Sequence, residues 1–85
     1  MHIDYHKNFT KMYGKLPQKL KDKFNERLKL FIDDSHAPEL NNHALHGQYL
    51  GCRSINVTGD LRAVYEVREN GIRFIDIDTH SNLYK

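Results

Sequence analysis

Apolar residues recur every three or four positions between residues 16 and 31, a spacing typical of a helix with one buried face. Pro17 suits the first turn of such a helix, where its missing N–H costs no hydrogen bond, so we expect the helix to run from there to about Ile32. A shorter helix is expected over residues 9–13, with Asn8 as its cap and Gly14 at its end. The apolar face of the longer helix consists of Leu16, Leu20, Phe24, Leu28 and Phe31.

Beyond residue 42 the apolar period shortens to two, which is typical of strands. We expect strands over residues 53–57, 61–67 and 72–78, and a short first strand over residues 3–5. The segment Thr58-Gly59-Asp60 predicts a turn. Asn70 and Gly71 tolerate positive φ and predict a tight hairpin. Residues 33–42 are expected to form a loop, because Pro38 disfavours helix through them. In the strand over residues 61–67, one face is formed by Leu61, Ala63, Tyr65 and Val67.

The predicted order of elements is strand, helix, helix and then three strands. This order indicates an α+β fold in which two helices pack on one face of a mainly antiparallel sheet. A chain of 85 residues is typical of one small domain, so we expect residues 1–85 to form a single domain. Its core can be only modest, which predicts marginal stability or stability shared with a partner.

Composition narrows the class of protein further. Cys52 is the single cysteine, which excludes an internal disulfide, favours a reducing compartment such as the cytoplasm, and is expected to be a small buried apolar residue. The first residues lack an apolar signal core, and no apolar run approaches the ~20 residues needed to cross a membrane. The net charge of +2 hides an asymmetry, since residues 1–31 carry eight Lys or Arg and three acids. Such a segment attracts a polyanion or an acidic protein.

The residues that could take part in catalysis are concentrated after residue 42. Imidazoles, a carboxylate, guanidiniums and a phenol are the groups needed to cut RNA without a metal, because histidine transfers protons near neutral pH and arginine binds phosphate oxygens. A phenol can also stack on a base. A small sheet could bring these groups onto one face. The candidates are His43, Arg53, Asp60, Arg62, His80 and Tyr84.

Each candidate also has a simpler interpretation. His46 lies three residues from His43 and is its main rival, whereas His2, His6 and His36 are expected to be surface residues without a role. Asp60 could merely cap its turn. Arg62 could pair with Glu66 on the same strand face, and Tyr84 could simply pack the terminus.

Two further patterns involve charged residues at regular spacing. Asp76, Asp78 and His80 alternate along the last strand and would point to the same face, where they could hold a divalent cation. A solvated strand face is the better interpretation, and no metal or other cofactor is expected. Lys19, Lys23 and Arg27, spaced by four on the longer helix, form a basic stripe. This stripe is either an ordinary solvated face, a rail for ribosomal RNA phosphates, or a dock for an acidic partner helix.

The motifs H-x-L-x-G, R-S, D-x-R-x-x-Y and T-H-S-x-L-Y together resemble the RelE/ParE superfamily of bacterial toxins, most closely its YafQ branch. The resemblance covers the whole chain, including its opening residues. It implies a RelE-like fold and a cognate antitoxin, with operator DNA contacted only through that antitoxin. It also implies action on messenger RNA in the ribosomal A site.

The YafQ catalytic pattern falls on His43, Asp60, His80 and Tyr84. A second family histidine falls on Asn56, whose amide can bind a phosphate but cannot transfer protons. A basic family residue falls on Asp76, which reverses the charge, and a family glycine falls on Asp78. The resemblance therefore predicts a toxin that is a metal-independent, ribosome-dependent mRNA endonuclease. The alternatives are a non-enzymatic ParE-like toxin acting on DNA gyrase, or an attenuated relative that mainly binds its antitoxin.

Overall fold

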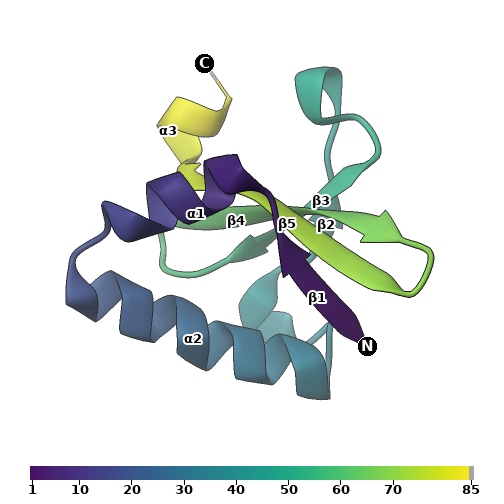
Figure 1. Cartoon of the computed structure of the whole chain (residues 1–85), viewed down its shortest axis with the longest axis horizontal. Helices are drawn as coiled ribbons and strands as arrows, with labels where there is room; N and C mark the ends of the chain where they lie inside the picture. Colours follow the sequence, from purple (N-terminus) through teal and green to yellow (C-terminus); the bar gives the residue numbers. More distant parts are fainter. Residues whose placement is uncertain (85) are drawn as a thin grey trace.

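Five strands form one mixed sheet in the order β1-β5-β4-β3-β2 (Figure 1). β1 pairs with β5 in parallel, and the other neighbouring strands pair antiparallel. The structure is a computed structural model that describes residues 1–84. The predicted α+β fold is confirmed. The strands are β1 (His2–Tyr5), β2 (His43–Ala44), β3 (Cys52–Asn56), β4 (Leu61–Arg68) and β5 (Gly71–Thr79).

The two predicted helices are present, and a third follows the last strand. α2 begins at Gln18, one residue later than the sequence predicted, with Pro17 as its N-cap rather than in its first turn. The prediction that Asn8 caps α1 is wrong, because the cap is His6, whose Nδ1 accepts a hydrogen bond from the backbone N–H of Asn8 at 3.0 Å. The loop after α2 contains a short turn of 3₁₀ helix that was not predicted. The helices are α1 (Lys7–Gly14), α2 (Gln18–Asp33) and α3 (His80–Leu83), with 3₁₀ turns η1 (Pro38–Leu40) and η2 (Gly47–Tyr49).

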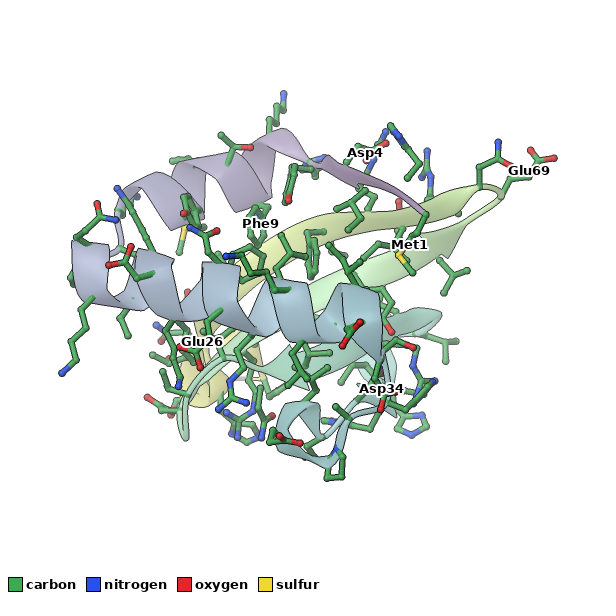
Figure 2. The ribbon with its side chains drawn as sticks, turned by 90° about the horizontal axis from the view of Figure 1, so that it is seen from below. Met1, Asp4, Phe9, Glu26, Asp34 and Glu69 are labelled. Atoms are coloured by element: carbon green, nitrogen blue, oxygen red, sulfur yellow. The ribbon has the colours of Figure 1, made fainter. Side chains whose placement is uncertain are left out.

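The main core lies between the sheet and helices α1 and α2. Phe9 reaches between these helices, as Figure 2 shows, and its ring lies 5.3 Å from Phe24 and 5.5 Å from Phe74. Both predicted apolar faces meet here, with the exception of Val67, which is 67% exposed. Val67 lies near the tip of the β4–β5 hairpin, beyond the helices that cover the rest of the strand (Figure 1).

A smaller apolar cluster covers the opposite face of the sheet. Leu45, Val64 and Leu83 are buried there, and half-buried Cys52 packs against them. Burial raises the pKa of the Cys52 thiol, which favours a packing role over a reactive one. In Figure 1, α3 and the teal segment around residues 46–50 rise from this side, whereas α2 lies on the other. The sheet is therefore covered on both faces, which the sequence did not predict.

A β-bulge determines which residues of β5 reach the second face. Val64 is opposite Asp76 and Tyr65 is opposite Phe74, so Ile75 is the extra residue. Phe74 lies in the main core, whereas Ile75 packs against the second cluster. The bulge therefore interrupts the strict alternation along β5 and places Ile75 and Asp76 together on the second face.

The hairpin turn before β5 forms where Asn70 and Gly71 predicted it, but not for the predicted reason. Among residues 1–84, positive φ occurs at Asn41, Gly47 and Gly51, and neither hairpin residue adopts it. Gly71 is needed for another reason: a Cβ there would overlap the backbone carbonyl of His2, its neighbour in β1. The missing side chain lets the first strand add to the sheet.

Candidate functional site

A hollow of about 370 Å³ opens on the second face of the sheet, between η2 and α3. The side-chain amide of Gln48 donates a hydrogen bond to the backbone carbonyl of Leu83 at 3.1 Å. This bond joins the two walls of the hollow. Its lining residues are His46, Gly47, Gln48, Leu83 and Tyr84.

His80 is the first residue of α3 rather than the end of a strand. The hydroxyl of Thr79 caps this helix by accepting from the N–H of Asn82 at 3.2 Å. The N–H of His80 donates to the backbone carbonyl of Asp60 at 2.9 Å. The exposed imidazole lies 4.7 Å from the ring of Tyr84, at 62°. The structure thus brings three of the predicted site residues together at one end of the sheet.

The turn before β4 presents Asp60 without using its side chain as a cap. The hydroxyl of Thr58 accepts from the N–H groups of Asp60 and Leu61, at 3.3 Å and 3.0 Å. The expectation that Asp60 caps the turn is therefore wrong, and its carboxylate is exposed to solvent. A carboxylate at this position can accept a proton or orient a ligand.

Arg62 lies beside this turn. Its Nη1 donates to the backbone carbonyls of Thr58 and Gly59 at 2.9 Å each. The alternative pairing with Glu66 is wrong, because that carboxylate pairs with Arg68 at 2.6 Å. Arg62 therefore supplies a positive charge at the same end of the sheet as His80.

Asn56 shares a row with Arg62 across the sheet. Asn56 pairs with Arg62 on β4, and Arg62 pairs with Asp78 on β5. The Oδ1 atom of Asn56 is buried and has no hydrogen-bond partner in the described part of the chain. A side-chain carbonyl oxygen only accepts hydrogen bonds and cannot donate one to a phosphate. Any phosphate contact from Asn56 must therefore come from its Nδ2.

The structure separates the two rival histidines. His43 lies on β2, three strands away from β5, which is a backbone separation of about 14 Å. Its Nδ1 lies 2.8 Å from the carbonyl of Asn41. His46, in contrast, lines the hollow together with Tyr84. His46 is therefore the imidazole that faces α3 across the hollow.

Arg53 does not join this group. Its Nε donates to the side-chain carbonyl of Asn42 at 2.7 Å, and the amide nitrogen of Asn42 lies 2.8 Å from the hydroxyl of Tyr65, a main-core residue. Arg53 pairs with Tyr65 on β4, whereas Arg62 pairs with Asn56, three residues further along β3. Because side chains alternate between faces, Arg53 and Arg62 lie on opposite faces, and the expectation that all the candidates share one face is wrong for Arg53.

Sequence reasoning missed Tyr49, which is central to this face. Its hydroxyl donates to Oδ2 of Asp76 at 2.8 Å, and its ring lies 6.4 Å from Tyr84 at 86°. Burial, followed by the bond to Asp76, raises the pKa of Tyr49 to about 12. No sequence pattern links the segments that contain residues 49 and 76, so their contact could not be predicted. The sequence showed only that an aromatic residue follows His46 by three positions.

The alternative metal site does not form. Within residues 1–84 there is no group of three His, Cys, Asp or Glu side chains that could hold a metal ion. Oδ1 of Asp76 and Oδ1 of Asp78 each accept from the N–H of the following residue, at 2.8 Å and 2.7 Å. His80 starts a helix instead of continuing the strand alternation, which is why the three side chains do not converge.

The basic stripe lies on α2, which is on the opposite side of the sheet from α3, one wall of the hollow (Figure 1). Lys23 is 3.4 Å from Glu26, and Nε of Arg27 is buried without a hydrogen-bond partner among the described residues. Lys19 completes the stripe. No helix within residues 1–84 combines the length and apolar character needed to cross a membrane.

Solved structures with the same architecture are bacterial toxins. YafQ from Escherichia coli strain BL21(DE3) matches with a TM-score of 0.81 and 25% identity, over 99% of this chain and 98% of that chain. YafQ in the E. coli DinJ–YafQ complex matches with a TM-score of 0.78 and 26% identity, over 99% and 98%. A YoeB/ParE toxin from Agrobacterium tumefaciens shares the fold at 20% identity, with a TM-score of 0.77, over 94% and 99%.

These matches define the class as a RelE/ParE-like toxin fold. The profile described as "Bacterial toxin of type II toxin-antitoxin system, YafQ" matches residues 1–85. The chain therefore belongs to the YafQ family of type II toxins, as its motifs predicted. No curated protein sequence matches it at a significant level.

Proposed function

We propose that this toxin is a ribosome-dependent endoribonuclease that cuts messenger RNA without a metal. The observation that carries the proposal is the exposed imidazole of His80, which lies against Tyr84 and is joined through its backbone to Asp60. An exposed imidazole, an exposed carboxylate on the residue whose backbone it bonds, and the ring of Tyr84, which lines the hollow, suit acid–base attack on a ribose-linked phosphate.

The reaction uses the ribose 2′-hydroxyl as nucleophile. A base takes its proton, the 2′-oxygen bonds to phosphorus, and the bond to the 5′-oxygen breaks. An acid protonates this leaving oxygen, which gives a 2′,3′-cyclic phosphate and a free 5′-hydroxyl end. Cationic groups stabilise the additional phosphate charge in the transition state.

His80 is proposed as the general acid, since it is exposed and close to the aromatic platform of Tyr84. Arg62 is proposed to bind the phosphate. The general base is Asp60 or an imidazole of the opposite wall, where His46 lines the hollow and His43 lies further away on β2. We favour His46 over His43 because His46 lines the hollow together with Leu83 and Tyr84 of the opposite wall, whereas His43 lies on β2.

The proposal is tested by inducing the protein in bacteria and mapping the 5′ ends of transcripts. We expect new 5′ ends within coding regions, and their loss together with growth arrest in a His80→Ala variant. His36→Ala is the matched control, because His36 is exposed in the loop after α2 and should change nothing. A His80→Ala variant that remains fully toxic would remove the assignment.

Separate variants identify the base. His46→Ala should lower the cleavage rate by about 10²-fold or more if the imidazole takes the proton, whereas His43→Ala should have a smaller effect. Asp60→Asn provides the third comparison. Equal and small effects of all three would show that none of them is the base.

The second candidate is a non-enzymatic toxin that acts on DNA gyrase. It is favoured by the two departures at Asn56 and Asp76, which remove one imidazole and one cation from the family pattern. It predicts DNA-damage signalling with intact transcripts after induction. If neither damage signalling nor cleavage occurred, the attenuated relative that mainly binds its antitoxin would remain.

We also propose a cognate antitoxin as the partner in the cytoplasm, with contact to operator DNA only through it. E. coli YafQ is seen in complex with DinJ, and a YoeB toxin from Staphylococcus aureus with YefM. The helical layer carries most of the basic residues and a hollow of about 240 Å³, which suits an acidic segment with an apolar anchor. This hollow is lined by Tyr5, Phe9, Thr10, Tyr13, Phe24 and Asn25.

A further inference from the structure

The hollow of about 370 Å³ between η2 and α3 is called the first hollow below. A second hollow, of about 420 Å³, lies on the same face of the sheet as the first, between the start of α1 and η2. Tyr49 forms one of its walls, and the same ring makes an edge contact with Tyr84 in the first hollow. The two hollows are therefore neighbours across one aromatic side chain. The residues that line the second hollow are His6, Asn8, Tyr49, Glu66, Ile75 and Asp76.

The carboxylate of Asp76 is held in one orientation in this hollow. Oδ2 accepts from the hydroxyl of Tyr49 at 2.8 Å, and Oδ1 accepts from the N–H of Ile77 at 2.8 Å. Each carboxylate oxygen has two lone pairs, so both can accept one further hydrogen bond. Asp76 is thus a pre-oriented pair of acceptors that is only half-buried.

The charges of the second hollow disfavour a phosphate. Glu66 and Asp76 both line it, and although Glu66 is paired with Arg68, the carboxylate of Asp76 repels a phosphate group. His6 offers its remaining ring nitrogen, because its Nδ1 already accepts from the N–H of Asn8. An RNA strand crossing this face would therefore place a base here and keep its phosphates on the side of Arg62 and His80.

We propose that the second hollow is a nucleobase subsite, in which Asp76, held by Tyr49, accepts hydrogen bonds from N1–H and the N2 amino group of guanine. Guanine is the base that presents two parallel donors to a carboxylate, whereas uracil presents one N–H, and cytosine and adenine present one amino group. This inference rests on the proposed function for the identity of the ligand as RNA. It also gives Asp76 a role. The family has a basic residue at this position, and a carboxylate there cannot bind a phosphate but can accept hydrogen bonds from a base.

The subsite is connected to the proposed reacting groups through direct contacts. The ring of His80 lies 4.7 Å from Tyr84, and the ring of Tyr84 lies 6.4 Å from Tyr49. A base held by Asp76 would thus lie on the far side of Tyr49 from the imidazole. The guanine would belong to a nucleotide next to the scissile phosphate, so Asp76 would set sequence preference rather than perform chemistry.

The test measures binding of short 2′-O-methyl RNA oligonucleotides, which lack the 2′-hydroxyl nucleophile and cannot be cut. We expect an oligonucleotide with one guanine to bind at least about fivefold tighter than the same sequence with inosine, which lacks the N2 amino group, or with uracil. Asp76→Asn and Tyr49→Phe should each abolish this preference. Asp78→Asn is the matched control, since Asp78 lies two residues away and bonds to Asn82.

Equal binding of the guanine, inosine and uracil oligonucleotides by the parent protein would overturn the inference. So would a guanine preference that survives both substitutions in variants with the circular dichroism spectrum of the parent. Mapping of transcript ends separates this result from the proposed function. Cleavage without guanine preference would remove the subsite alone, whereas guanine-selective binding without cleavage would remove the nuclease and keep the subsite.

Discussion

At the scale of single residues, the site is organised by hydrogen bonds between residues far apart in the chain. Tyr49 bonds to Asp76, and Gln48 bonds to the carbonyl of Leu83. Thr58 takes over the capping of a turn, which leaves the Asp60 carboxylate exposed. Each of these bonds fixes a group that the proposed chemistry or base recognition needs, so small substitutions are informative.

One prediction concerns the pH at which Tyr49 loses its proton. Its folded pKa is raised from 10.0 to about 12, first by burial and then by the bond to Asp76. The stabilisation from this bond is therefore fully present below pH 10 and is lost as the pH rises through 12. Tyrosinate absorbance should show a titration near pH 12 that disappears in Tyr49→Phe and persists in Tyr84→Phe, whereas the lesser delay of Tyr5, whose pKa burial also raises, should remain in both variants. A titration near pH 12 that persists in Tyr49→Phe would contradict this assignment.

At the scale of elements, the first strand depends on a glycine in the last. β1 pairs in parallel with β5, and His2 lies opposite Gly71. A β1 that detached would also release His6, which caps α1 and lines the second hollow. The edge of the sheet and the proposed subsite are therefore coupled through one short strand.

Gly71→Ala should destabilise the protein by about 1–3 kcal/mol, because the added Cβ overlaps the backbone carbonyl of His2 and must displace β1. Chemical denaturation measures the change in the free energy of unfolding. Gly14→Ala is the control, since a Cβ at Gly14 meets no atom within 4 Å and alanine is the better helix former. Similar stabilities for the two variants would show that β1 and β5 can accommodate a Cβ at position 71 without loss of stability.

At the scale of the whole molecule, the sheet separates two surfaces with different charge and shape. The helical side carries the basic residues of α1 and α2, and the opposite side carries the first and second hollows. Binding of ribosomal RNA or of an acidic antitoxin is therefore proposed for the helical side, and the chemistry is proposed for the other. A toxin with this arrangement could hold ribosomal RNA or an acidic antitoxin on its helical side without covering the first and second hollows.

Binding to ribosomes should accordingly weaken steeply as salt rises. Lys19→Gln combined with Lys23→Gln should lower the slope of log affinity against log salt by about one to two. Lys7→Gln combined with Lys11→Gln removes the same charge from α1, on the same side of the sheet, and serves as the control for the stripe. Equal slopes for the two pairs would show that the basic side as a whole, rather than the stripe on α2, sets the salt dependence.

Local patterns in the sequence determined most of the fold. The period of three to four predicted α2 and its buried Phe24, because helical spacing is a property of neighbouring residues. The period of two predicted β3, β4 and β5 for the same reason. The short elements β2 and α3 were missed, since two and four residues are too few to establish a period. The β-bulge was missed as well, because it shows only when β4 and β5 are paired.

For the site, the sequence by itself determined which groups are present, and the family motifs pointed to His43, Asp60, His80 and Tyr84. Only the tertiary structure decided which groups share a face, because that depends on register, on the bulge at Ile75 and on the turn that starts α3. It separated Arg53 from Arg62, and it joined Tyr49 to Asp76 across 27 positions of the chain. Contacts of this kind arise from the pairing of distant strands, which no local pattern records.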